Sequence, residues 1–149
     1  MRLIPIPLYN SPGIGAMAVS PLITDWVRGN QTFYTVVGFK PPWIAYLAVE
    51  TDAIVGTCAF KGKPRNNVVE IAYGTHTSCE GKGIATRMAA ELVQIARSND
   101  PTVRIIAQTL PEHNASTRVL TKNGFTHVRD AVDDEVGNVW EWELTATGG

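Results

Sequence analysis

The stretch over residues 68–98 constrains the fold of this 149-residue chain more than any other segment. It predicts an apolar strand over 68–73, a small polar turn, and a helix over 85–98 whose apolar residues recur at helical spacing. The first backbone N–H groups of a helix lack partners and lie at the positive end of its dipole, and glycine lets a ligand come close to them. Gly81 and Gly83 therefore predict an anion-binding turn before this helix.

Composition narrows the class of protein. A chain of 149 residues with 44% hydrophobic content predicts a single domain over 1–149. The 13 basic and 14 acidic residues are spread along the chain, so no basic stripe suggests nucleic acid as a partner. Two cysteines without an N-terminal signal pattern predict a cytoplasmic location, and no run approaches the roughly 18 apolar residues of a membrane span.

The first half of the chain predicts an edge of the sheet and two short helices. Residues 3–8 contain two prolines, which suits an edge strand. Over 21–39 the apolar spacing suits one short helix that ends at Gly29 and Asn30, followed by a second. Two apolar runs, 43–49 and 54–60, then predict a hairpin.

The second half predicts the remainder of an α/β fold. The helix over 85–98 connects the strand over 68–73 to another over 103–109, which makes the two strands parallel neighbours. A helix over 114–123 and a hairpin formed by 126–131 and 139–144 follow. We therefore expect one mixed sheet with helices on both faces.

Two familiar phosphate loops do not fit the glycine turn. A P-loop requires Ser or Thr after its Gly-Lys pair, but Gly83 follows Lys82. The dinucleotide fingerprint requires a third glycine, and Thr86 stands there.

Two motifs stand in order with a predicted strand between them: the turn Glu-Gly-Lys-Gly-Ile-Ala over 80–85, and a block over 109–125 that contains Pro-Glu-His-Asn-Ala-Ser and ends in Leu-Thr-Lys-Asn-Gly-Phe. They resemble the pyrophosphate-wrapping turn of the Gcn5-related N-acetyltransferase (GNAT) family and the Pro-Glu-x-Asn-x-Ser…Leu-x-Lys-x-Gly-Phe block of its ribosomal-protein alanine acetyltransferases. The resemblance covers residues 43–144. The resemblance implies acetyl-coenzyme A as co-substrate, no metal, and a sheet that splays after the strand over 68–73. It leaves 1–42 as the acceptor side.

The resemblance also implies which residues hold the cofactor. Backbone groups near a bulge at Gly74 would pair with the pantetheine arm, and Asn114 would hold the same arm, although an Asn there also suits a helix N-cap. The expected cofactor-binding residues are Gly74, Thr75, His76, Glu80, Gly81, Lys82, Gly83, Ile84, Ala85, Thr86 and Asn114.

Two residues are candidates for catalysis. Glu70 interrupts an apolar strand, where a carboxylate is costly unless it is paired or used, and attack by an amine on a thioester requires a base. Its alternative is an ion pair with an arginine, or solvent exposure. By resemblance Ser116 protonates the departing thiolate. Leu120 stands where many relatives have a tyrosine acid, and Glu80 where they have Arg or Gln.

The leading hypothesis is an N-acetyltransferase that acts by direct attack of a primary amine, carried by a small molecule or a protein N-terminus. The alternative is a non-catalytic acyl-coenzyme A binding or sensing module. A third reading is an oligomeric scaffold that uses the strand with Trp140 and Trp142, and a homodimer is compatible with all three. The acceptor is expected against 21–39 and 61–67.

Overall fold

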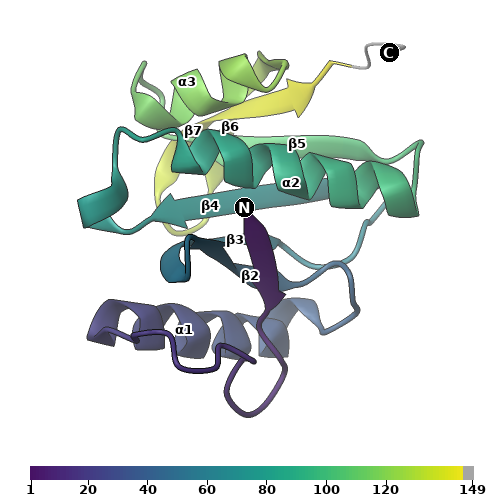
Figure 1. The fold of residues 1–149 in the computed structure, drawn as a ribbon. Helices are drawn as coiled ribbons and strands as arrows, with labels where there is room; N and C mark the ends of the chain where they lie inside the picture. The colour runs from purple at the N-terminus through teal and green to yellow at the C-terminus, as the bar shows by residue number, and fades with distance from the viewer. Residues whose placement is uncertain (146–149) are drawn as a thin grey trace.

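A computed structural model describes residues 1–145 of the chain (Figure 1). It contains one seven-stranded sheet in the order β1-β2-β3-β4-β5-β7-β6. The fold class predicted from the sequence, a single mixed α/β sheet, is confirmed. The elements are β1 (Arg2–Pro5), α1 (Pro21–Val37), β2 (Ala45–Glu50), β3 (Ala53–Phe60), β4 (Val68–Thr75), the 3-10 turn η1 (Thr77–Cys79), α2 (Ile84–Asn99), β5 (Arg104–Thr109), α3 (Ala115–Lys122), β6 (Phe125–Asp133) and β7 (Gly137–Leu144).

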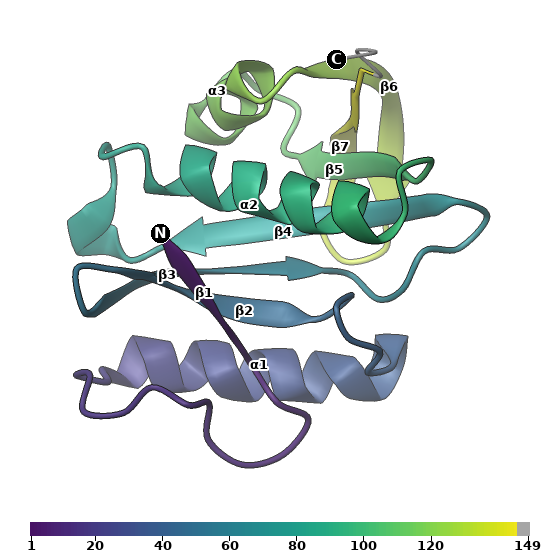
Figure 2. The same cartoon turned by 45° about the vertical axis from the view of Figure 1, so that its right-hand side comes forward.

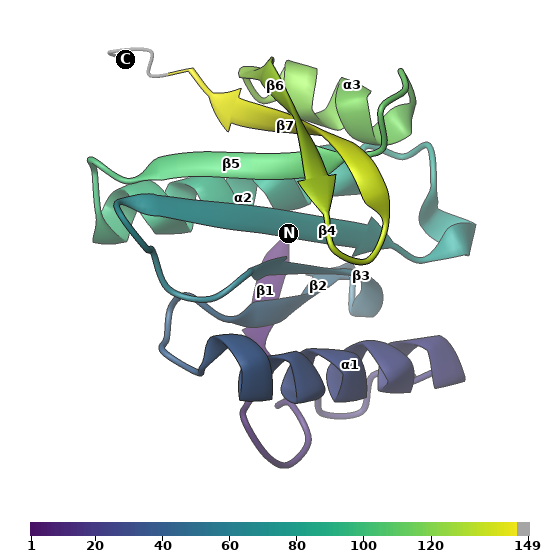
Figure 3. The same ribbon diagram turned by 180° about the vertical axis from the view of Figure 1, so that it is seen from behind.

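The helices are divided between the two faces of the sheet. Figures 1 and 2 show α2 in front of β4. Figure 3, drawn from behind, shows α1 on the viewer's side of the molecule and α2 behind the sheet. The apolar stripe of α2 is buried against β3 and β4, with Met88, Ala89 and Leu92 fully enclosed. The predicted parallel pair is confirmed, since β4 and β5 run in the same direction on either side of α2. This arrangement places the start of α2 beside the end of β4.

Helix α1 is continuous, so the predicted break at Gly29 and Asn30 is wrong. The Ser20 hydroxyl caps its first turn, and it ends at Gly38, whose φ is +90°. The Asn30 side chain donates to the Trp26 carbonyl, a bond within the helix, instead of ending it. The local stop signal is present but is overridden by the packing of the whole helix.

A buried tyrosine anchors this helix to the sheet edge. The Tyr34 hydroxyl donates to the carbonyl of Ile6 at 2.8 Å and accepts from the backbone N–H of Ala45 at 2.9 Å. Burial raises the pKa of this phenol. Tyr34 lies three turns from Ile23, the other buried residue of α1, so both face the core. This tertiary anchor lies in the part of α1 beyond Gly29, which explains why the second half remains helical.

Gly29 offers a test of this continuous helix. A Cβ at Gly29 would meet no atom within 4 Å. Gly29→Ala is therefore expected to raise the free energy of unfolding by about 0.5–1 kcal/mol, since alanine loses less backbone entropy in a helix. Urea denaturation measures the change. The matched control is Gly38→Ala, which should be destabilising because its φ is +90°. A loss of stability in Gly29→Ala would contradict a continuous α1.

The sheet opens between β4 and β5. These strands pair only from Val68 with Arg104 to Ile71 with Ala107, although both continue further. The predicted splay is confirmed, and it begins at Ile71 instead of after residue 73. The bulge expected at Gly74 is wrong, because Gly74 pairs in regular register with β3. Strand β4 therefore stays straight along β3 and separates from β5 alone.

The C-terminal hairpin is confirmed and is longer than predicted. Strand β7 inserts between β5 and β6. Trp142 is buried, and its indole N–H donates to the Thr109 hydroxyl at 3.0 Å. Glu141, on the face opposite Trp142, is also buried, where it forms an ion pair with Arg129.

Both cysteines are free thiols, Cys58 buried and Cys79 partly exposed. None of the helices within residues 1–145 combines the length and apolar character needed to cross a membrane.

Candidate functional site

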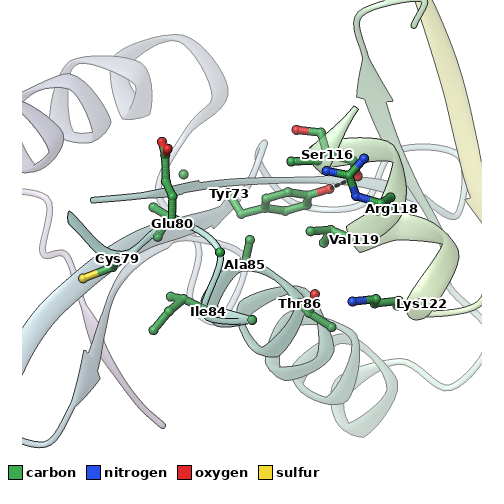
Figure 4. Close-up of a pocket in the computed structure, with 15 residues that line it drawn as sticks. Tyr73, Cys79, Glu80, Ile84, Ala85, Thr86, Ser116, Arg118, Val119 and Lys122 are labelled. Carbon is green, nitrogen blue, oxygen red and sulfur yellow. Dashed lines mark hydrogen bonds between the residues drawn. The ribbon is translucent and has the colours of Figure 1, made fainter. Parts of the chain in front are cut away.

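A cavity of about 410 Å³ lies at the opening between β4 and β5 (Figure 4). Its volume is in the range of small-molecule and cofactor sites. Its walls come from the end of β4, the turn before α2, the first turn of α2, and one side of α3. The lining residues are Tyr73, Gly74, Thr75, Cys79, Glu80, Gly81, Gly83, Ile84, Ala85, Thr86, Ala115, Ser116, Arg118, Val119 and Lys122.

The glycine turn forms one wall of this cavity. Gly81 and Gly83 have φ of +78° and +75°, left-handed conformations that favour glycine. Gly83 is the N-cap of α2, and no side chain caps its free N–H groups. The start of α2 also carries no acidic residue in its first turn. These features leave the positive end of the helix dipole available to an anion.

Two cations lie on the opposite wall. Arg118 and Lys122 are one turn apart on α3, and both side chains border the cavity (Figure 4). The Glu80 carboxylate points away from them in the same view. Neither cation is among the site residues predicted from the sequence, although their spacing of four residues places them on one helix face. Together with the start of α2, they make the cavity suited to a ligand with several negative charges.

Tyr73 lines the cavity from the end of β4. Its hydroxyl donates to the main-chain carbonyl of Ser116 at 3.1 Å and so connects β4 to α3 across the opening (Figure 4). Burial raises the pKa of the Tyr73 phenol well above its usual value, so the hydroxyl stays protonated at neutral pH. Tyr73 is also absent from the site residues predicted from the sequence.

Glu70 lies on the other face of β4. Alternation along the strand directs it away from Tyr73 and from α2. Its carboxylate forms an ion pair with the Lys61 ammonium at 2.8 Å, and its side chain is 20% exposed. The partner is a lysine of the loop after β3, whereas the ion pair expected from the sequence was with an arginine.

Comparison with known sequences identifies the family. A sequence model described as an acetyltransferase (GNAT) domain matches residues 19–126. The chain belongs to the GNAT acetyltransferase domain family. It is also 32% identical over 84 residues to YjdG, an uncharacterized N-acetyltransferase of Bacillus subtilis (strain 168), a match that covers 54% of this chain and 50% of that protein. The chain thus spans about half the length of this curated relative.

Solved structures share the GNAT fold at low identity. RimL, a ribosomal alpha-N-protein acetyltransferase in complex with coenzyme A, aligns with a TM-score of 0.64 at 19% identity over 85% of this chain and 72% of its own. An aminoglycoside acetyltransferase in complex with coenzyme A aligns with a TM-score of 0.60 at 21% identity, over 69% of this chain and 66% of its own. At these identities the likeness concerns the fold.

The GNAT domain brings most of the predicted site residues together. Nine of them line the cavity: Gly74, Thr75, Glu80, Gly81, Gly83, Ile84, Ala85, Thr86 and Ser116. Glu70, His76, Lys82 and Asn114 are not among the residues that line it.

All four have other contacts in the GNAT domain, and for Lys82 the contact is through its carbonyl, which accepts from the Arg87 Nη1 at 3.3 Å. Asn114 caps α3, since its side chain accepts from the Thr117 N–H at 3.1 Å. The His76 ring packs edge-on against Trp26 of α1, and its Nδ1 accepts from the Ser78 backbone N–H. Glu70 is paired with Lys61. Residues 1–145 contain no group of three or more His, Cys, Asp and Glu side chains arranged to hold a metal.

Proposed function

We propose that this protein is an acetyl-coenzyme A-dependent N-acyltransferase that transfers an acetyl group to a primary amine by direct attack. The observation that carries the proposal is the cavity at the opening between β4 and β5, where the uncapped start of α2 faces two cations of α3. Membership of the GNAT family supports the same reading. The acceptor class is a small-molecule amine or a protein N-terminus.

The cavity walls suit the parts of coenzyme A. A diphosphate requires several N–H donors and positive charge, which the first turn of α2 and the pair Arg118 and Lys122 provide. An arm with amide groups suits the edge of β4 at Gly74 and Thr75, beyond the last pair with β5. Coenzyme A supplies an acyl group activated as a thioester. The chain's contribution is to bind, orient and exchange protons.

Two groups have proposed roles in proton transfer. Glu70, on the face opposite the cavity, would accept a proton from the acceptor's ammonium, directly or through water, and Lys61 orients its carboxylate. Ser116 borders the cavity and would donate a proton to the leaving sulfur. Leu120 is fully buried and apolar, so it takes no part in proton transfer.

Calorimetry with acetyl-coenzyme A, followed by free-thiol release with a panel of amines, tests the function. Binding with turnover on one amine class is expected. Absence of binding at millimolar cofactor would contradict the proposal. The alternative, a non-catalytic acyl-coenzyme A binding module, is supported by the Glu70 ion pair and by Leu120. It predicts binding without thiol release on every amine.

Glu70→Gln is expected to lower turnover roughly 100-fold at neutral pH, the usual scale for loss of a general base. The loss should shrink as pH approaches the pKa of the amine, about 10.4 for a lysine-like acceptor, because the amine then needs no base. The matched control is Glu143→Gln. Glu143 is also ion-paired, with Arg104, and lies on the same sheet face two strands away. Equal rates for Glu70→Gln and wild type would exclude Glu70 as the base.

The proposal extends to the acceptor site, the cellular location and the partners of the enzyme. The acceptor would lie against α1 and the loop over 61–67, on the face of the sheet that carries Glu70. Two free cysteines support a cytoplasmic location, and the net charge of -1 supports the absence of a nucleic-acid partner. Light scattering would decide whether two copies associate.

A further inference from the structure

We infer that Arg87, held by Glu50, positions the glycine turn for the cofactor's phosphates from outside the cavity. The inference rests on the proposed function for its ligand. Arg87 is in the first part of α2, and Glu50 is the last residue of β2. Neither is among the residues that line the cavity.

The contacts form a chain from the sheet to the turn. The Arg87 Nε donates to the Glu50 Oε1 at 2.7 Å, and the Arg87 Nη1 donates to the Lys82 carbonyl at 3.3 Å. A Cβ built on Gly83 would lie 3.3 Å from the same Nη1. The guanidinium therefore contacts the turn directly beside Gly83.

This contact sets the orientation of one peptide unit. In a trans peptide the carbonyl and the following N–H point in opposite directions. Holding the Lys82 carbonyl toward Arg87 consequently directs the Gly83 N–H away from Arg87. Gly81 and Gly83 line the cavity, whereas Lys82 and Arg87 do not. The guanidinium thus contacts the turn on the side away from the ligand.

The turn needs such a constraint because its sequence is permissive. Both glycines adopt left-handed conformations, and glycine populates many others at little cost. Gly83 is the N-cap of α2, and no side chain accepts from the N–H groups of the first turn. Glu50 in turn restricts Arg87, a long side chain that would otherwise sample many rotamers. The Arg87 side chain is 47% exposed and that of Glu50 is 27% exposed. An ion pair this exposed contributes little to global stability, which leaves local positioning as its main effect.

A direct phosphate contact by Arg87 is the competing explanation, and Glu50 separates the two. If Arg87 bound the phosphates itself, Glu50→Gln would free its charge and remove a nearby negative charge, so affinity would rise. If Arg87 positions the turn, Glu50→Gln loosens Arg87 and affinity falls. The two explanations predict opposite signs for one conservative substitution.

The experiment is calorimetric titration of wild type, Glu50→Gln, Arg87→Ala and the double variant with acetyl-coenzyme A. We expect about fivefold weaker binding for each single variant and no further loss in the double variant, because the two residues act as one unit. The matched control, Arg104→Ala, removes the guanidinium of an ion pair at the far end of the sheet and should leave affinity unchanged.

Amide hydrogen exchange in the free protein supplies a second readout. We expect the protection factor of the residue-87 amide, which donates to the Gly83 carbonyl at 3.1 Å, to fall in both single variants, with the later turns of α2 unchanged. Higher affinity in Glu50→Gln, or unchanged protection of the residue-87 amide, would overturn the inference. If wild type bound no acetyl-coenzyme A, the proposed function would fail, while protection of the residue-87 amide would still decide whether Arg87 holds the turn.

Discussion

Acetyl-coenzyme A is expected to bind on the order of 100-fold more weakly when Arg118 and Lys122 are both changed to glutamate. The two side chains border the cavity from one face of α3, opposite the start of α2. A charge-assisted hydrogen bond to phosphate contributes about 1.5–3 kcal/mol, and each reversal also adds repulsion. Calorimetry at low and at high salt measures the loss, which should be smaller at high salt because exposed charges are screened.

The control for this double reversal is Lys63→Glu with Arg65→Glu. Both residues are exposed in the loop between β3 and β4, and the net charge changes by the same amount. Affinity should stay near that of wild type. An equal loss in both double variants would show that only overall charge matters and would remove Arg118 and Lys122 from the binding site.

Gly56→Ala is expected to lower the free energy of unfolding by about 1–3 kcal/mol, the usual scale for overpacking. A Cβ at Gly56 would lie 2.8 Å from the Gly74 carbonyl oxygen and 2.9 Å from the sulfur and terminal carbon of Met88. Met88 can change rotamer, but the Gly74 carbonyl belongs to the neighbouring strand and cannot move alone. The methyl group would therefore push β3 from β4 or lift α2 from the sheet.

Gly74→Ala is the matched control for Gly56→Ala. Gly74 lies on the adjacent strand, and a Cβ there would meet no atom within 4 Å. Chemical denaturation of the two variants should give a clear difference in midpoint. Equal stability would show that α2 has room to move, contrary to the close contact of Met88 with Gly56.

The sequence predicted the fold wherever the signal is local and repeated. The apolar stripe of α2 and the alternation along β7 each extend over whole elements, and they led to the mixed sheet. The break predicted in α1 failed for the opposite reason. Gly29 and Asn30 are local stop signals, whereas Tyr34 hydrogen-bonds to the sheet edge, which depends on segments distant in sequence.

The candidate site was only partly predictable. The glycines before α2 form a contiguous motif, so they could be found. Tyr73 and Glu70 lie on the same strand with opposite faces, and the sequence does not indicate which face meets α3. Arg118 and Lys122 share a helix face by spacing, but their position beside the cavity depends on how α3 packs beside α2.

The early end of pairing between β4 and β5 creates an internal sheet edge. Beyond Ile71 and Ala107 the two strands continue without pairing to each other. An outer edge strand invites pairing with any other chain, whereas α2 covers one face of this inner edge. A slender, amide-bearing chain could lie there as an additional strand without displacing an existing pair. The gap between β4 and β5 therefore favours a narrow ligand with backbone-like amide groups, independently of the side chains around it.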